Sequence, residues 1–168
     1  MSVKITAVAK QLPPFTRETS EILPFIETWL HDQDSRFRRK VLKIFQGAGV
    51  DRRYSIMDAH QVFMNTSFEE RNDIYVEGMK TLGRQCVENA LNKAKWKPTD
   101  IDFLITVSCT GIMIPSVDAY LINELEMRQD VLRLPVTEMG CAAGVSGIIY
   151  AQNFLKANPG KRAAVVAL

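Results

Sequence analysis

Apolar residues recur with helical spacing twice in the first third of the chain. The first run, residues 22–30, follows Ser20, a residue suited to cap a helix, and Pro24 would lie in the first turn. A second and more basic run predicts a helix over residues 34–45, which a Gly-Ala-Gly segment would end. We expect two helices here, and an irregular linker that extends to Asn65.

The clearest helix signal begins at Ser67. The segment Ser67-Phe68-Glu69-Glu70 has the form of a capping box, with a serine at the cap and a glutamate three residues later. The apolar residues that follow share one face at helical spacing, namely Tyr75, Met79, Leu82, Cys86 and Ala90. This stripe predicts that Cys86 belongs to the core.

Short apolar runs elsewhere predict strands. A weak alternation marks residues 3–9, and mostly apolar runs mark residues 101–107, 131–136 and 162–168. The segments between the last three carry helical patterns, at residues 117–125 and 145–155. Alternation of strand and helix predicts an α/β layered fold.

Composition restricts the class of protein. A length of 168 residues fits one domain, which we assign to residues 1–168, and 46% hydrophobic with 24% charged residues is typical of a globular protein. The net charge of +2 is too small to indicate a nucleic-acid partner. No apolar run reaches the roughly 20 residues of a membrane span. Three cysteines without short paired spacing favour neither a disulfide framework nor a zinc site, so we expect a reducing, cytoplasmic setting and no metal.

Cys141 carries the candidate chemistry of the chain. It stands between the predicted strand at residues 131–136 and the helix at residues 145–155, directly after Gly140, which permits a sharp turn. Small residues follow and leave room beside the sulfur. A helix amino terminus favours a thiolate, which is a nucleophile for acyl transfer. The alternative from local sequence is a buried structural cysteine, which is what free cysteines usually are.

Four segments, taken in order, resemble one family. They are Arg-Arg-Tyr at residues 52–54, the loop at residues 105–119, the Glu-Met-Gly-Cys-Ala-Ala-Gly segment at residues 138–144, and the strand at residues 160–168. This set resembles the amino-terminal part of a type III polyketide synthase of the chalcone synthase-like group. The Ser-Cys-Thr-Gly-Ile-Met-Ile-Pro-Ser form of the loop is more similar to bacterial alkylpyrone- and alkylresorcinol-type enzymes than to plant chalcone synthases. The resemblance implies the amino-terminal half of a thiolase-like layered fold, with a mixed sheet and helices on both faces.

The resemblance also implies an activity and a set of site residues. Members of the family are acyltransferases that load an acyl group from coenzyme A onto a cysteine, here Cys141, and condense it with units from malonyl-CoA. Cys109 and Thr110 match residues that line the starter-acyl cavity, where plant members usually carry Thr-Ser. Ile114 matches a residue that reaches the partner subunit's cavity, which implies a homodimer. No cofactor is implied beyond the coenzyme A thioesters that serve as substrates.

Arg52 and Arg53 fall in the basic stretch that contacts coenzyme A phosphates in the family, and the sequence does not decide between them. A guanidinium group suits phosphate geometry, although an arginine on a surface turn is more often solvated. Cys109 has an alternative as well, because it could be a buried residue at the end of a strand.

The catalytic histidine and asparagine of the family lie in its carboxy-terminal half, and no segment here matches them. His31 and His60 precede Cys141 and fall in a helix and a linker, so we expect neither to be the catalytic base. We therefore expect the chain to be an amino-terminal portion that cannot form product alone.

Two other interpretations stay open from the sequence. A related thiolase-fold condensing enzyme, similar to a ketoacyl-carrier-protein synthase III or a hydroxymethylglutaryl-CoA synthase, would also carry a cysteine at this position. A non-catalytic half-protein that binds a complementing partner would explain the missing histidine. The starter acyl group, the number of extensions and the mode of ring closure stay open as well.

Overall fold

The computed structural model describes residues 2–64 and 67–168, so Asn65, the predicted end of the linker, lies outside the described residues. The chain forms two compact units. The smaller unit is Leu12–Ile74, and the larger unit is Tyr75–Leu168 together with the amino-terminal residues up to Gln11.

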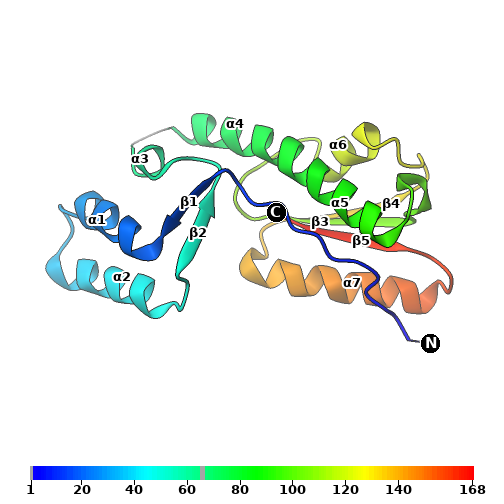
Figure 1. Cartoon of the computed structure of the whole chain (residues 1–168), viewed down its shortest axis with the longest axis horizontal. Coiled ribbons are helices and arrows are strands. Elements are labelled where there is room, and N and C mark those ends of the chain that lie inside the picture. The colour runs from blue at the N-terminus through cyan, green and yellow to red at the C-terminus, as the bar shows by residue number, and fades with distance from the viewer. Residues whose placement is uncertain (1, 65–66) are drawn as a thin grey trace. The chain divides into compact units, whose positions relative to one another are not determined.

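A parallel sheet of three strands forms the centre of the larger unit (Figure 1). The strands are β3 (Phe103–Val107), β4 (Leu132–Val136) and β5 (Ala163–Ala167), and β3 lies between the other two. Parallel neighbours need a crossover segment, and a helix supplies each one. The strands predicted at residues 101–107, 131–136 and 162–168 are thus confirmed, each slightly shorter than predicted.

Helices cover both faces of this sheet, because neighbouring side chains of β3 point to opposite sides. Leu104 packs in a core with residues of α5 (Arg84–Ala94) and α6 (Val117–Glu124). Ile105 and Val107 pack in a second core with residues of α7 (Ala143–Ala157). Figure 1 shows α7 on one side of the strands and α5 and α6 on the other. The predicted layered α/β arrangement is confirmed.

Close packing of α7 on the sheet depends on Gly147. A Cβ atom at this position would lie 3.0 Å from Val165 Cγ1 and 3.2 Å from Val107 Cγ1. We expect Gly147→Val to lower the free energy of unfolding by about 1–3 kcal/mol through overpacking. Urea unfolding measures this change. Gly144→Ala is the control, because its added Cβ meets no atom within 4 Å; equal stability of Gly147→Val and the unmutated protein would contradict the prediction.

The helix predicted from Ser67 changes its pitch partway along. Ser67 and Glu70 exchange backbone-to-side-chain hydrogen bonds of 2.8 and 3.1 Å, which confirms the capping box. A π-helical turn, Met79–Gly83, then separates α4 (Phe68–Gly78) from α5. Because a π turn holds more residues than an α turn, the buried face moves by one position. The predicted stripe over Leu82, Cys86 and Ala90 is therefore half-buried, and the fully buried residues are Gly83, Val87 and Leu91.

The strand predicted at residues 3–9 is wrong. This segment forms no regular structure, and its carbonyl groups accept hydrogen bonds from side chains of α5. Cys86 Sγ donates to the Ala9 carbonyl oxygen at 3.6 Å, and Lys93 Nζ donates to the Val8 carbonyl oxygen at 3.1 Å. Contacts to a helix thus replace the strand pairing that the alternation suggested.

The described residues of the smaller unit form a two-stranded antiparallel sheet, three helices and the first part of α4. The strands are β1 (Phe15–Glu18) and β2 (Arg52–Ser55), and the helices are α1 (Thr19–Trp29), α2 (Ser35–Gly47) and α3 (Ala59–Val62). The helix predicted over residues 34–45 is confirmed as α2, with Asp34 as its cap. Helix α1 begins earlier than predicted, and its cap is Glu18 and not Ser20. Helix α3 forms within the predicted irregular linker.

Candidate active site

Cys141 lies where the chain passes from β4 to α7. A short 3-10 turn, Gly140–Ala142, leads directly into the helix, and the Cys141 side chain is exposed and forms no disulfide. Gly140 has a φ of +56°, a conformation that other residues adopt only with strain. The predicted role of Gly140 in the turn is confirmed. The alternative of a buried structural cysteine does not fit an exposed sulfur.

One of the residues after Cys141 packs in the core, and another borders open space. Ala143 is buried against the sheet and fixes the start of α7, while Gly144 has open space where a Cβ would project. The start of α7 has no side-chain cap, and the Ala143 N–H donates to the Gly140 carbonyl oxygen. The positive end of the helix dipole lies at this end of α7 and favours a negatively charged group there. This arrangement can hold a nucleophile at a fixed, accessible position.

Cys109 and Thr110 leave the same edge of the sheet as the chain that leads to Cys141. Parallel strands place their carboxyl ends together, and ligands bind at this edge in open α/β sheets. The Ser108 N–H donates to the Val136 carbonyl oxygen at 3.0 Å, which joins the end of β3 to the end of β4. Both Cys109 and Thr110 are exposed, so Cys109 is not the buried strand-end residue of the alternative interpretation.

Tyr75 also contacts the chain at this edge of the sheet, and the sequence did not predict this contact. Its hydroxyl lies 2.6 Å from Ser108 Oγ, and its ring covers Gly111. The helical stripe assigned Tyr75 to the core, and its ring is buried. A buried tyrosine hydroxyl needs a partner, but periodicity does not tell which one.

The loop continues through a half-buried Met113 to Ile114, whose side chain is 91% exposed. Met113 packs against the core formed with α5 and α6. The loop ends where α6 begins, at Val117. The next residue, Asp118, is fully buried and accepts a hydrogen bond from the Ser116 hydroxyl. Arg133 Nε of β4 lies 3.4 Å from the second carboxylate oxygen of Asp118. The two ends of the loop are therefore fixed, while Ile114 projects outward.

Arg52 and Arg53 belong to the smaller unit, on strand β2. Arg52 Nε donates to Glu18 Oε1 at 2.9 Å, and this hydrogen bond raises the pKa of Arg52 above its usual value. Arg53 lies with its guanidinium carbon 5.0 Å from the centre of the Phe45 ring, and its Nε is buried without a hydrogen-bond partner among the described residues. Each arginine thus has a contact within its own unit, and a role toward coenzyme A stays a prediction.

Both histidines also belong to the smaller unit. His31 pairs with Asp32 through Nε2 at 3.0 Å, and His60 lies edge-on to Phe25 with ring centres 5.5 Å apart. These contacts are ordinary packing and surface interactions.

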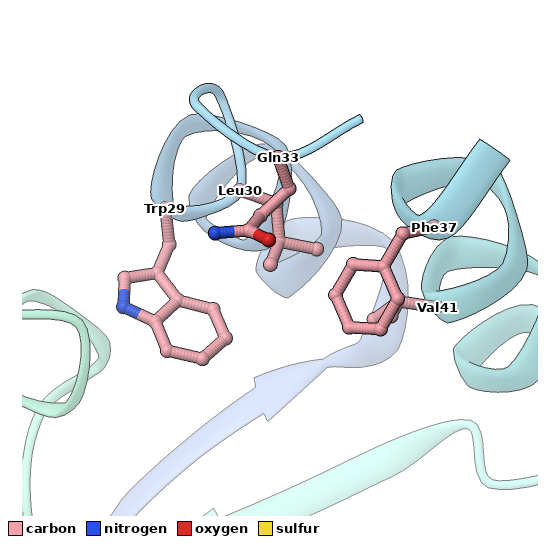
Figure 2. Close-up of a pocket in the computed structure, with 5 residues that line it drawn as sticks. All are labelled: Trp29, Leu30, Gln33, Phe37 and Val41. Carbon is pink, nitrogen blue, oxygen red and sulfur yellow. The ribbon is translucent and has the colours of Figure 1, made fainter. Parts of the chain in front are cut away.

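An apolar hollow of about 390 Å³ opens between α1 and α2. Figure 2 shows Trp29, Leu30 and Gln33 on one side of it and Phe37 and Val41 of α2 on the other. These side chains provide no acid, base or nucleophile. The hollow could therefore bury an apolar group, but it could not catalyse a reaction.

Among residues 2–64 and 67–168, no cluster of three or more histidine, cysteine or acidic side chains is arranged to hold a metal ion. No helix in the same part of the chain combines the length and the apolar character that a membrane crossing requires.

Comparison with known proteins identifies the family of this fold. Residues 16–168 match the family described as FAE1/Type III polyketide synthase-like protein. The chain is 35% identical over 130 residues to 1,3,6,8-tetrahydroxynaphthalene synthase of Streptomyces griseus, and this match covers 77% of the chain and 35% of that protein. It is 29% identical over 119 residues to phloroglucinol synthase of Pseudomonas fluorescens, and this match covers 71% of the chain and 34% of that protein.

A solved structure agrees with these sequence matches. The crystal structure of 1,3,6,8-tetrahydroxynaphthalene synthase from Streptomyces coelicolor A3(2) superposes with a TM-score of 0.86 at 30% identity, over 96% of this chain and 47% of that one. The chain thus spans about a third to a half of the length of these relatives. The match over residues 16–168 and the thiolase-like layers together show that the chain belongs to the type III polyketide synthase family.

Proposed function

We propose that the protein in which this chain occurs is a type III polyketide synthase, and that Cys141 is its acyl-accepting nucleophile. The observation that carries the proposal is the exposed thiol of Cys141 on the turn before α7, at the sheet edge from which the Cys109 loop also leaves. In a member of this family, that position provides a fixed nucleophile at the amino-terminal end of a helix. No feature of the described residues, 2–64 and 67–168, favours a ketoacyl-carrier-protein synthase III or a hydroxymethylglutaryl-CoA synthase over this family.

The proposed chemistry has two stages. The Cys141 thiolate attacks the carbonyl carbon of an acyl-CoA, the bond from that carbon to the coenzyme A sulfur breaks, and coenzyme A leaves as a thiol after taking a proton. Malonyl-CoA then loses carbon dioxide, and the enolate that remains attacks the carbonyl carbon of the Cys141 thioester. A carbon–carbon bond forms and the Cys141 thiolate is released for the next cycle.

Each predicted site residue receives a role in this scheme. Cys109 and Thr110 line the cavity that receives the starter acyl group, which their exposure at the sheet edge supports. Ile114 enters the cavity of a second subunit in a homodimer, because an apolar side chain that is 91% exposed gains from burial. One of Arg52 and Arg53 contacts a coenzyme A phosphate.

Product formation tests the proposal directly. We expect the full-length protein in which this chain occurs, given a long-chain acyl-CoA and carbon-13-labelled malonyl-CoA, to release coenzyme A and carbon dioxide and to form products that gain one labelled two-carbon unit per cycle. Mass spectrometry of the extracted products follows this gain, and acetyl-CoA and malonyl-CoA alone serve as alternative starters. Intact malonyl-CoA after incubation with every starter would contradict the proposal.

A further inference from the structure

Tyr75 makes a polar contact at the edge of the sheet where the Cys109 loop begins. Its side chain comes from α4 and is only 4% exposed. The hydroxyl lies 2.6 Å from Ser108 Oγ, a short distance for a hydrogen bond between two hydroxyl groups. Ser108 is the residue directly before Cys109.

Gly111 fits beneath the ring of Tyr75 only because it has no side chain. A Cβ atom at this position would lie 2.3 Å from two atoms of the Tyr75 ring. The ring therefore rests on the backbone of the loop two residues beyond Cys109. Tyr75 contacts the loop on both sides of the Cys109-Thr110 pair.

Ser108 connects this contact to the strand that leads to Cys141. Its N–H donates to the Val136 carbonyl oxygen at the end of β4, while its hydroxyl meets Tyr75. The position of Ser108 is thus set by β4 through the backbone and by Tyr75 through the side chain. A change in either contact moves the start of the loop relative to the end of β4.

We propose that Tyr75 is a positioning residue that fixes Cys109 and Thr110 and thereby sets the selectivity among acyl starters. The inference rests on the proposed function for its effect on selectivity, but the placement of the loop can be measured without catalysis. A purely structural tyrosine would stabilise the larger unit and leave the preference among starters unchanged.

Two substitutions remove the hydrogen bond from opposite sides. Tyr75→Phe keeps the ring over Gly111, and Ser108→Ala removes the other hydroxyl. We expect each to change the ratio of kcat/KM for octanoyl-CoA to that for acetyl-CoA by about two- to tenfold, the range of one hydrogen bond. The double variant should change the ratio no further, because both single variants break the same bond. Tyr120→Phe is the matched control, because the Tyr120 ring packs against the core of the same unit. Lys80 Nζ lies over this ring, 5.7 Å from its centre.

Iodoacetamide labelling gives the readout that needs no turnover. We expect Tyr75→Phe to change the labelling rate of Cys109 relative to that of Cys86 by about twofold or more, as measured by peptide mass spectrometry. Unchanged labelling and starter ratios, with or without a lower melting temperature, would overturn the inference. A changed labelling ratio in a protein that forms no polyketide would uphold the positioning of the loop and reject the proposed function instead.

Discussion

Replacing Cys141 by alanine is expected to abolish polyketide formation and to remove the covalent acyl-enzyme. Loss of the nucleophile in an enzyme that works through a covalent intermediate costs about three orders of magnitude or more in kcat. The direct neighbours of the thiol, Gly140 and Ala142, carry no nucleophilic group that could replace it. Product yield by mass spectrometry gives the first measurement, and the acyl adduct on the intact protein gives the second.

The other two cysteines provide matched controls for Cys141→Ala. Cys86 is half-buried on α5 and donates to the Ala9 carbonyl oxygen, so Cys86→Ala should keep most of the activity. Cys109 is exposed on the loop, and Cys109→Ala should change the preference among starters without removing the acyl-enzyme. Activity of Cys141→Ala above a tenth of that of the unmutated protein would contradict its role as nucleophile.

Asp102→Asn is expected to produce the second large effect, on stability. Asp102 is 8% exposed and lies just before β3, at the edge of the sheet opposite to Cys141. Its carboxylate accepts hydrogen bonds from Lys161 Nζ at 2.9 Å, the Arg162 N–H at 2.9 Å and Arg128 Nη2 at 3.1 Å. Asparagine keeps one acceptor oxygen but replaces the other with an NH2 donor, so at least one of these three donors loses its acceptor. We expect the free energy of unfolding to fall by about 1.5–3 kcal/mol, the range for hydrogen bonds to charged groups.

The same carboxylate predicts a dependence of stability on pH. Burial raises the pKa of Asp102, but the hydrogen bonds from Lys161, Arg162 and Arg128 outweigh it, and the net pKa lies below the usual 3.8. A carboxylate with a lowered pKa stabilises the folded state above its unfolded pKa, and this stability is lost as the pH falls through the folded pKa. The difference in stability between Asp102→Asn and the unmutated protein should therefore be full at pH 7 and shrink below a pH of about 4.

Asp130→Asn is the control for Asp102→Asn. Asp130 pairs with the same Arg128 at 2.9 Å, but its side chain is 79% exposed. A surface ion pair of this kind contributes between about 0 and 1 kcal/mol. Urea unfolding of the three proteins at pH 7 and pH 3 gives the comparison. Equal losses for the two variants at pH 7, or a loss for Asp102→Asn that does not change with pH, would contradict the account.

The parts of the fold that the sequence predicted are those with strong local patterns. The buried strand at residues 101–107 carries a mostly apolar run, and the segment from Gly140 into α7 carries a glycine, small residues and then apolar residues. The location of Cys141 followed from this local order alone. Its accessibility did not, because the same sequence also suits a buried thiol.

The errors arose where contacts distant in sequence or small changes in pitch decide the structure. Strand β2 is held by pairing with β1, and its Arg-Arg-Tyr-Ser sequence has no apolar pattern that would reveal a strand. The π turn at Met79–Gly83 moved the buried face of the helix by one residue. The predicted stripe assumed a regular α-helical spacing throughout, so it did not include this shift. The contact of Tyr75 with Ser108 and Gly111 joins α4 to a loop more than 30 residues later, so only the three-dimensional structure shows it.

The most direct test of the central claim is to find which residue carries the acyl group. The protein is incubated with an acyl-CoA but no malonyl-CoA, quenched in acid and digested, and the peptides that contain Cys86, Cys109 and Cys141 are analysed by mass spectrometry. The account predicts a mass increase of one acyl group on the peptide that contains Cys141 and none on the peptides with Cys86 and Cys109. An acyl group on Cys109 alone, or on no cysteine in a protein that still forms polyketide, would contradict it.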